Sequence, residues 1–313
     1  MPITNNFQPA QVGASYTPNL YSSLDDMIGK IAHQIIKGIE TKDPLAVFDK
    51  VPVDNGDTIE QAVVKLIDAS AYDATGAGAL TRETATSVAV RYFNNWQRHT
   101  YKKTIDMSML RKVMTNGASA EEVADKIVST MSRSRIHDKY KSLVALLQWG
   151  RQVGSYDLST AVIQKTGSTI SAGADGRIDS KAILRKLKNT IKGFGYVSTS
   201  YNVPAIKQSS ALDDIYVVMS YKLRNALDVD ELAGVFNLEK DRIDAKIIEI
   251  DDDDAYIYVL DQNAILDFTR LNEMVSQLNA DGLFYNYFLH IEDMFAVSPL
   301  FNTCYIEVAG TIE

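Results

Sequence analysis

The residues of this sequence that could carry out chemistry are few, and they do not form a recognisable catalytic motif. Gly76-Ala77-Gly78 is half of a dinucleotide-binding fingerprint, but the third glycine is missing. There is no Gly-x-Ser-x-Gly nucleophile turn, no phosphate-binding loop ending in Gly-Lys-Ser/Thr, and no His-Glu-x-x-His zinc helix. We therefore interpret the glycines as a flexible hairpin tip. The sequence predicts a protein that is not an enzyme and that binds no cofactor.

Potential metal ligands are also scattered along the chain. The four aspartates at 251–254 could bind calcium, but they lack the alternation and the glycine of a calcium loop. A solvated hairpin turn between strands at 246–250 and 256–260 is favoured instead. None of the four histidines lies at a chelating distance in sequence from another: His33, His99, His137 and His290. We predict no metal site, although a metal-dependent hydrolase using residues 251–254 with His290 remains the alternative from another class.

The only cysteine is Cys304, which excludes an intrachain disulfide and a cysteine-based zinc site and fits a reducing compartment. It lies in a predicted strand and is interpreted as a small apolar residue. With 46% hydrophobic residues the composition is globular, no apolar run is long enough for a membrane helix, and the first residues lack a secretion-signal pattern. We therefore expect the chain to stay in the cytosol, away from membranes.

The net charge of the chain argues against a protein whose main role is to bind nucleic acid. The formal net charge is -8, whereas phosphate binding needs a concentrated lysine and arginine surface. An acidic shell around DNA would still be reasonable, because a like-charged wall does not trap the polymer. One predicted helix carries a basic row that could contact nucleic acid or an acidic neighbour, although a solvated helix face is favoured: Lys181, Arg185, Lys188 and Lys192.

The elements that would position these residues begin with a segment rich in proline. Five of the seven prolines lie within the first 52 residues, and the next is Pro204, so the segment is interpreted as an extended arm. Between Pro18 and Pro44 an amphipathic helix is predicted. Its apolar stripe needs a covering surface and consists of Leu24, Met27, Ile28, Ile31, Ile35 and Ile39.

A long hairpin is predicted next. Residues 58–68 are rich in β-branched residues and indicate a strand, with Ala62, Val64 and Leu66 on one face. After a small polar tip at 70–86, the chain returns through 87–105, with Val88, Val90, Tyr92 and Trp96 predicted on one face. A two-stranded ribbon is marginal alone in water, so we expect this one to lie on a neighbouring molecule.

The clearest predicted element is a long helix. It follows a capping box in which Ser119 stands three residues before Glu122, and its apolar stripe continues to Trp149-Gly150. About 30 residues would span roughly 45 Å. A second helix is predicted from Ser180 as cap, with Ile183, Leu184, Leu187 and Ile191 facing inward. Further strands are predicted at 215–219, 246–250, 256–260, 284–291 and 304–308, and a short helix near 230–236.

This order of elements resembles the major capsid fold of tailed bacteriophages, the Hong Kong 97 fold, over nearly the whole chain. The segments 88–105 (VAVRYFNNWQRHTYKKTI), 106–113 (DMSMLRKV) and 227–237 (LDVDELAGVFN) look like capsid segments of short-tailed and related phages of Gram-positive hosts. The resemblance implies an α+β capsid fold. Its parts would be an N-terminal arm at 1–57, an extended loop at 58–105, a spine helix and peripheral domain at 106–155 completed by 291–313, and an axial domain at 156–290.

By the same resemblance, the chain would be a major capsid protein that assembles as hexamers and pentamers into an icosahedral head around double-stranded DNA. Its partners would be copies of itself, a portal, and DNA held without sequence-specific contacts. No coiled-coil-like segment precedes the arm, so an attached scaffolding domain is not expected, while a separate scaffolding protein stays open. The chain would assemble in the host cytoplasm and end in the virion. An encapsulin-like shell around a protein cargo is the alternative with the same fold.

Apolar residues of the arm and hairpin are the predicted contacts between subunits. They are Leu24, Ile28, Ile31, Val64, Leu66, Val90, Tyr92 and Trp96.

Overall fold

The computed structural model describes residues 43–54, 56–67, 69, 71–72, 74–76, 88–106, 117–152, 161–174, 176–227, 246–252, 255–282 and 284–311. The predicted helices between Pro18 and Pro44 and near 230–236 lie outside these residues, as does most of the predicted hairpin tip. The described residues divide into two compact units. Unit 1 contains Arg98–Lys139 and Leu271–Glu292, and unit 2 contains Pro44–Gln97, Tyr140–Arg270 and Asp293–Glu313.

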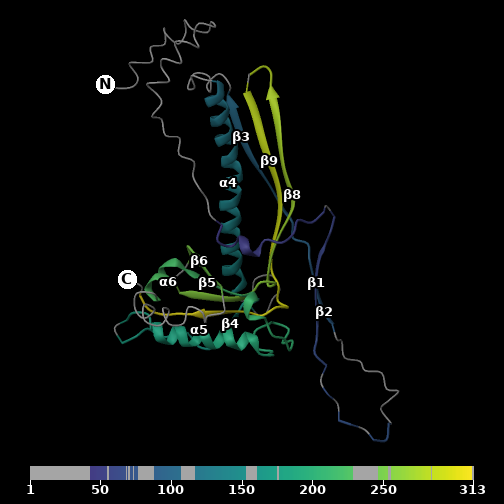
Figure 1. The fold of residues 1–313 in the computed structure, drawn as a ribbon, viewed down its shortest axis with the longest axis vertical. Helices are drawn as coiled ribbons and strands as arrows, with labels where there is room; N and C mark the ends of the chain where they lie inside the picture. Colours follow the sequence, from purple (N-terminus) through teal and green to yellow (C-terminus); the bar gives the residue numbers. More distant parts are fainter. Residues whose placement is uncertain are drawn as a thin grey trace. The chain divides into compact units, whose positions relative to one another are not determined.

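A mixed five-stranded sheet lies at the centre of unit 2, in the order β4-β10-β7-β5-β6 (Figure 1). Its central strand β7 runs antiparallel to both of its neighbours, while the outer strands β4 and β6 run parallel to theirs. The bounds are β4 (Gln164–Lys165), β5 (Ile215–Ser220), β6 (Lys246–Ile250), β7 (Tyr256–Asp261) and β10 (Thr303–Glu307). Every residue of β5 is buried, which explains why this strand is a continuous apolar run.

Both faces of this sheet are covered. Helix α5 (Ser180–Gly195) packs Ile183, Leu187 and Ile191 onto one face, where they join Val217, Val259 and Ile306 in a single core cluster. The other face receives Leu143 and Leu147 from the long helix, together with Leu45 and Phe48 of the 3-10 helix η2 (Ala46–Phe48). The Phe48 ring meets Tyr216 edge to face, 5.3 Å between centroids.

The start of α5 differs from the sequence prediction by one residue. Asp179, not Ser180, is the N-cap, because Asp179 has extended backbone angles and its Oδ1 accepts a hydrogen bond from Ala182 N at 3.0 Å. Ser180 is already helical and buried. The four predicted inward positions of this helix are all buried.

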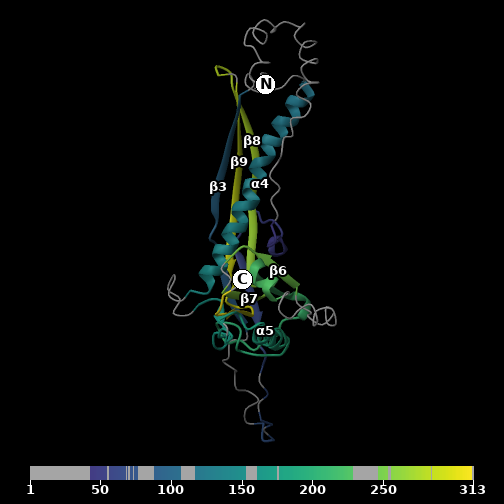
Figure 2. The same cartoon turned by 90° about the vertical axis from the view of Figure 1, so that its left-hand side faces the viewer.

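Unit 1 contains parts of a three-stranded sheet, in the order β3-β9-β8, and of the long helix α4 (Figure 2). The strands are β3 (Gln97–Asp106), β8 (Ile265–Asn279) and β9 (Phe284–Val297). Met131 of α4 packs against Leu289 and Ile291 of β9, and the Tyr101 hydroxyl donates to Asp138 Oδ2 at 2.9 Å. A small core therefore joins this part of α4 to one face of the sheet.

Polar cross-strand pairs link β3 to β9. Arg98 forms an ion pair with Glu292 at 3.3 Å, and the Thr100 hydroxyl lies 3.0 Å from His290 Nδ1. Further along, Thr104 Oγ1 donates to Asn286 Oδ1 at 2.6 Å, and Lys102 Nζ lies 5.5 Å from the centre of the Phe288 ring. Such directly opposed pairs fix the register of two strands.

Helix α4 (Gly117–Gly150) confirms the predicted long helix. Its 34 residues correspond to about 51 Å at 1.5 Å per residue. Along the described part of the predicted apolar stripe, Met131, Val144 and Leu147 are buried. No helix within the described ranges is long and apolar enough to cross a membrane.

Two predicted features of strand pairing were wrong. The hairpin predicted over 58–105 pairs only from β1 (Ile59–Val64) to β2 (Val88–Phe93), because the chain leaves the ribbon at 94–96 and β3 joins β9. Residues 251–254 do not connect a hairpin, because β5 lies between β6 and β7. The last strand, β10, lies inside the five-stranded sheet, between β4 and β7. Strand β8 and helix α6 (Tyr221–Leu227) were not predicted.

Candidate subunit interface

The β1–β2 ribbon sorts its side chains by strand alternation. Its register pairs Glu60 with Tyr92, Ala62 with Val90, and Val64 with Val88, and these residues share one face of the ribbon. The pairs on the opposite face are Ile59–Phe93, Gln61–Arg91 and Val63–Ala89. We call Ala62, Val64, Val88, Val90 and Tyr92 the apolar ribbon face.

The apolar ribbon face is exposed to solvent. The exposed fractions are 72% for Val64, 63% for Tyr92, 42% for Val90 and 38% for Val88. The opposite face is largely half-buried, and the Gln61 side chain donates from Nε2 to the Asn263 carbonyl oxygen at 3.0 Å. A contiguous set of exposed valines and a tyrosine on a narrow ribbon is typical of a surface that another molecule covers.

Sequence reasoning located most of this face. It brought together Val64, Val90 and Tyr92, and Leu66, just beyond β1, is 56% exposed. Trp96 is the exception, since it lies beyond the end of β2 and is half-buried with the Arg270 guanidinium 4.6 Å from its ring centre. Leu24, Ile28 and Ile31 lie outside the described residues. The interface role of all eight remains a prediction.

Sequence reasoning missed other exposed apolar residues. Val51 is 80% and Ile67 is 78% exposed, and Ile67 continues the β-branched run that identified β1. Along β8, Met274, Val275 and Leu278 are 42%, 42% and 50% exposed. For the three β8 residues, the signal that could have found them is a strand with apolar side chains on both faces and too few partners to cover them.

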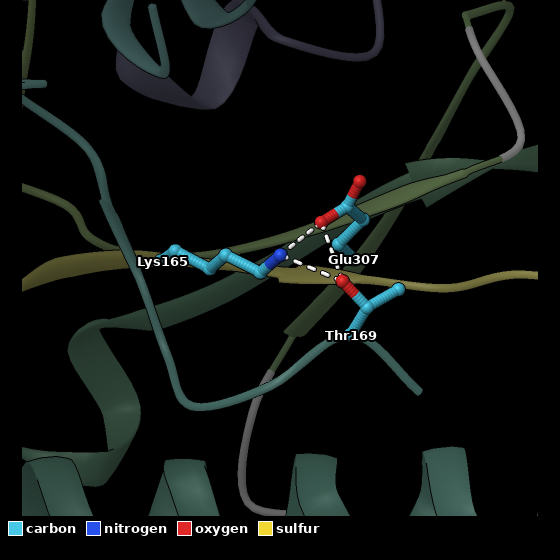
Figure 3. Close-up of polar contacts among 3 residues, drawn as sticks. All are labelled: Lys165, Thr169 and Glu307. Atoms are coloured by element: carbon cyan, nitrogen blue, oxygen red, sulfur yellow. Dashed lines mark hydrogen bonds and ion pairs between the residues drawn. The ribbon is translucent and has the colours of Figure 1, made fainter. Parts of the chain in front are cut away.

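A compact ionic cluster lies at the edge of the five-stranded sheet (Figure 3). Lys165 Nζ donates to Glu307 Oε2 and to Thr169 Oγ1, and the Thr169 hydroxyl donates to the same carboxylate at 2.8 Å. The hydrogen bond to Lys165, followed by that to Thr169, lowers the pKa of Glu307, and the Glu307 contact raises the pKa of Lys165. These mutual contacts are typical of a structural link between the short edge strand β4 and β10, not of a reactive centre.

The residues considered as metal ligands or as a nucleophile make hydrogen bonds within the fold or are buried in it. Asp252 Oδ1 accepts from Gln148 Nε2 at 2.5 Å, and Asp251 N donates to the Tyr140 hydroxyl at 2.7 Å, while 253–254 lie outside the described residues. Burial raises the pKa of the Cys304 thiol well above its ordinary value. Within the described part of the chain, no group of three histidine, cysteine, aspartate or glutamate side chains is arranged to hold a metal ion.

Comparison with known sequences gives a consistent result along the chain. A family model described as Phi29-like phage major capsid protein matches residues 4–307. The major capsid protein of Bacillus phage B103 is 25% identical over 312 residues, covering 96% of this chain, and that of Bacillus phage GA-1 is 23% identical over 288 residues, covering 90%. The chain spans 67% of the length of the first relative and 58% of the second.

Comparison with solved structures supports the fold. A capsid structure of Staphylococcus phage Andhra aligns with a TM-score of 0.72 over 88% of this chain and 87% of that chain, at 12% identity. At this identity the likeness concerns the fold alone. It confirms the predicted α+β capsid fold of the Hong Kong 97 type.

Proposed function

This chain belongs to the Phi29-like phage major capsid protein family, and we propose that its copies assemble as hexamers and pentamers into an icosahedral head around a double-stranded DNA genome. The family is one of structural proteins, so the chain is a component of the virion. The encapsulin-like and hydrolase alternatives gain no support from the family match.

The observation that carries the proposal is the apolar ribbon face. Its valines and tyrosine are exposed on a two-stranded ribbon, an element that is marginally stable alone in water. Covering this face with a second copy would stabilise the contact by about 25 cal/mol per Å² of apolar surface, before the cost of ordering is subtracted. The same surface repeated on every copy suits a shell built from many equivalent contacts.

We assign the parts of the fold by their sheets and helices. The ribbon corresponds to the extended loop, and α4 with the three-stranded sheet corresponds to the spine helix and peripheral domain. The five-stranded sheet with α5 corresponds to the axial domain, which would surround the centre of each hexamer and pentamer. This assignment moves β10 into the axial domain and shortens the extended loop predicted at 58–105 to the ribbon and its tip.

Acidic charge would tune assembly. Each copy carries a formal charge of -8, so copies repel one another at low ionic strength. Added salt screens such repulsion over a Debye length of about 10 Å at 0.1 M. Higher salt is therefore expected to favour assembly, and assembly that does not respond to salt would contradict this part of the proposal.

Other partners complete the proposal. The head would assemble in the host cytoplasm with a portal, with or without a separate scaffolding protein, and it would hold DNA without sequence-specific contacts. The net negative charge supports this last point, because a protein that reads sequence needs a concentrated basic surface.

Electron microscopy of the purified full chain and of phage-infected cell extracts tests the proposal. The expected result is closed icosahedral particles whose contents, after nuclease treatment of the outside, are double-stranded DNA. Particles that contain a co-purifying enzyme instead of DNA would favour the encapsulin-like alternative. A chain that stays monomeric under all conditions in which relatives assemble would refute the shell function.

A further inference from the structure

Helix α5 carries a concentration of positive charge that the capsid assignment does not explain. Its 16 residues contain five lysines and arginines and no aspartate or glutamate, in a chain whose formal net charge is -8. Four of these cations follow one another at intervals of four, three and four residues. We call them the α5 basic stripe: Lys181, Arg185, Lys188 and Lys192.

Helical geometry places the stripe on one narrow face. At about 100° per residue, its four residues fall within an arc of about 60° around the helix axis. Lys181, Arg185 and Lys192 are exposed and Lys188 is half-buried. The fifth cation, Lys186, lies outside this arc and is half-buried.

The helix that carries the stripe is packed firmly against the five-stranded sheet. On the opposite side of α5, Ile183, Leu187 and Ile191 are 0%, 2% and 5% exposed, and all three lie in the core cluster of the five-stranded sheet. The charges are therefore held on a fixed helix, so binding a partner costs little backbone ordering.

The stripe matches a phosphate backbone better than a protein surface. It is roughly 16 Å long at 1.5 Å per residue, a length over which duplex DNA carries about ten phosphate charges. Its exposed neighbours on the helix are Asn189 and Gly195, and the exposed apolar residues Tyr196 and Val197 lie beyond the end of the helix. Protein–protein interfaces have cores enriched in aromatic residues and depleted in charge, whereas interfaces with DNA are polar and positively charged.

We propose that the α5 basic stripe lies against the phosphate backbone of the enclosed DNA and binds it without sequence preference. This inference rests on the proposed function, because a shell that holds DNA supplies the partner. It adds that the acidic subunit would contact DNA through the α5 basic stripe. Unit 2, which contains the five-stranded sheet, would then be the part of the subunit that contacts the genome.

The proposal predicts a specific salt dependence. If the four cations each neutralise one phosphate, the logarithm of the binding constant falls with the logarithm of salt concentration with a slope of about -3.6. Between 50 and 200 mM salt, the affinity for DNA would then fall roughly 10²-fold. A single weak contact would give a slope near -1 instead.

The experiment measures binding of a fluorescently labelled mixed-sequence duplex to the unassembled full chain by anisotropy. One variant replaces the four stripe residues with glutamine. A matched control replaces four other exposed lysines with glutamine and so has the same net charge: Lys103, Lys141, Lys207 and Lys222. We expect the stripe variant to lose at least tenfold in affinity at 50 mM salt and the control variant to lose less than threefold. Thermal melting would verify that both variants are folded.

Three results of the binding experiment would overturn the inference. The first is no duplex binding by the unchanged chain at 50 mM salt. The second is an equal loss for both variants, which would mean that net charge alone matters. The third is equally tight binding of polyglutamate, which would indicate an acidic protein partner. Particle formation by the unchanged chain tests the proposed function separately, so DNA-filled shells of the stripe variant with unaltered DNA content would count against this inference alone.

Discussion

Replacing Val64 and Tyr92 with serine should raise the protein concentration needed for shell formation and leave the subunit folded. The two side chains are 72% and 63% exposed on the apolar ribbon face, so the isolated subunit gains little from them. For Tyr92, 63% of roughly 200 Å² at 25 cal/mol per Å² corresponds to about 3 kcal/mol in an interface. For Val64, 72% of about 2 kcal/mol adds about 1.5 kcal/mol. If a neighbouring copy covers half of this surface, the double substitution weakens each contact by about 2 kcal/mol. This corresponds to a roughly 30-fold change in affinity.

The assay follows assembly of the full chain by light scattering and negative-stain microscopy across a range of protein concentrations. Its control replaces Tyr196 and Val197 with serine, since these residues are of the same types and are 75% and 57% exposed near the end of α5. We expect the ribbon variant to need at least a 30-fold higher concentration for particles, with an unchanged melting temperature of the unassembled chain. Unchanged assembly, an equal defect in the control, or an unfolded ribbon variant would refute the reasoning.

Three further predictions concern the subunit itself. Gly310→Ala should lower the free energy of unfolding by about 2 kcal/mol in urea titrations, because Gly310 has φ +129° and an added Cβ would lie 2.8 Å from a backbone nitrogen. Gly56→Ala should lower it less, because Gly56 has φ +99° but open space around the added Cβ. Cys304 should not react with an aromatic disulfide reagent until urea unfolds the chain, because its thiol is buried and has a raised pKa; rapid reaction in the native state would contradict this placement. Lys165→Met should lower the melting temperature slightly at neutral pH. The pKa of Glu307 is lowered from 4.5 and the pKa of Lys165 is raised from 10.5. The difference in melting temperature between the variant and the unchanged chain should therefore shrink as pH falls through the folded pKa of Glu307 or rises through that of Lys165. A difference that persists at pH 2 would refute the ion pair as its cause.

Local patterns in the sequence predicted the type of most described elements. The β-branched runs at 215–219 and 256–260 form strands, and the apolar stripe that ends at Trp149-Gly150 belongs to the long helix. These elements are recognisable because each has a continuous face or stripe to bury. Strand β8 is harder to see, because Ile265–Asn279 mixes amide, acidic and apolar residues and becomes exposed along most of its length.

Pairing between strands could not be predicted in the same way. Nothing near 246–260 indicates that β5 separates β6 from β7, because that order depends on contacts between distant segments. The break at 94–96 is also invisible to alternation, since Trp96 keeps the period of Val90 and Tyr92 while its ring meets Arg270. The apolar ribbon face was predictable because alternation alone determines which residues share a face.

The place of β10 has a consequence for how the subunit is made. This strand lies between β4 and β7, so the five-stranded sheet stays open until residues 303–307 have emerged from the ribosome. At 5 to 20 residues per second, roughly ten seconds separate the synthesis of β4 from that of its sheet partner β10. Chains released early by stalled ribosomes would lack a closed core, and we expect proteases to remove them before they could take a place in a growing lattice.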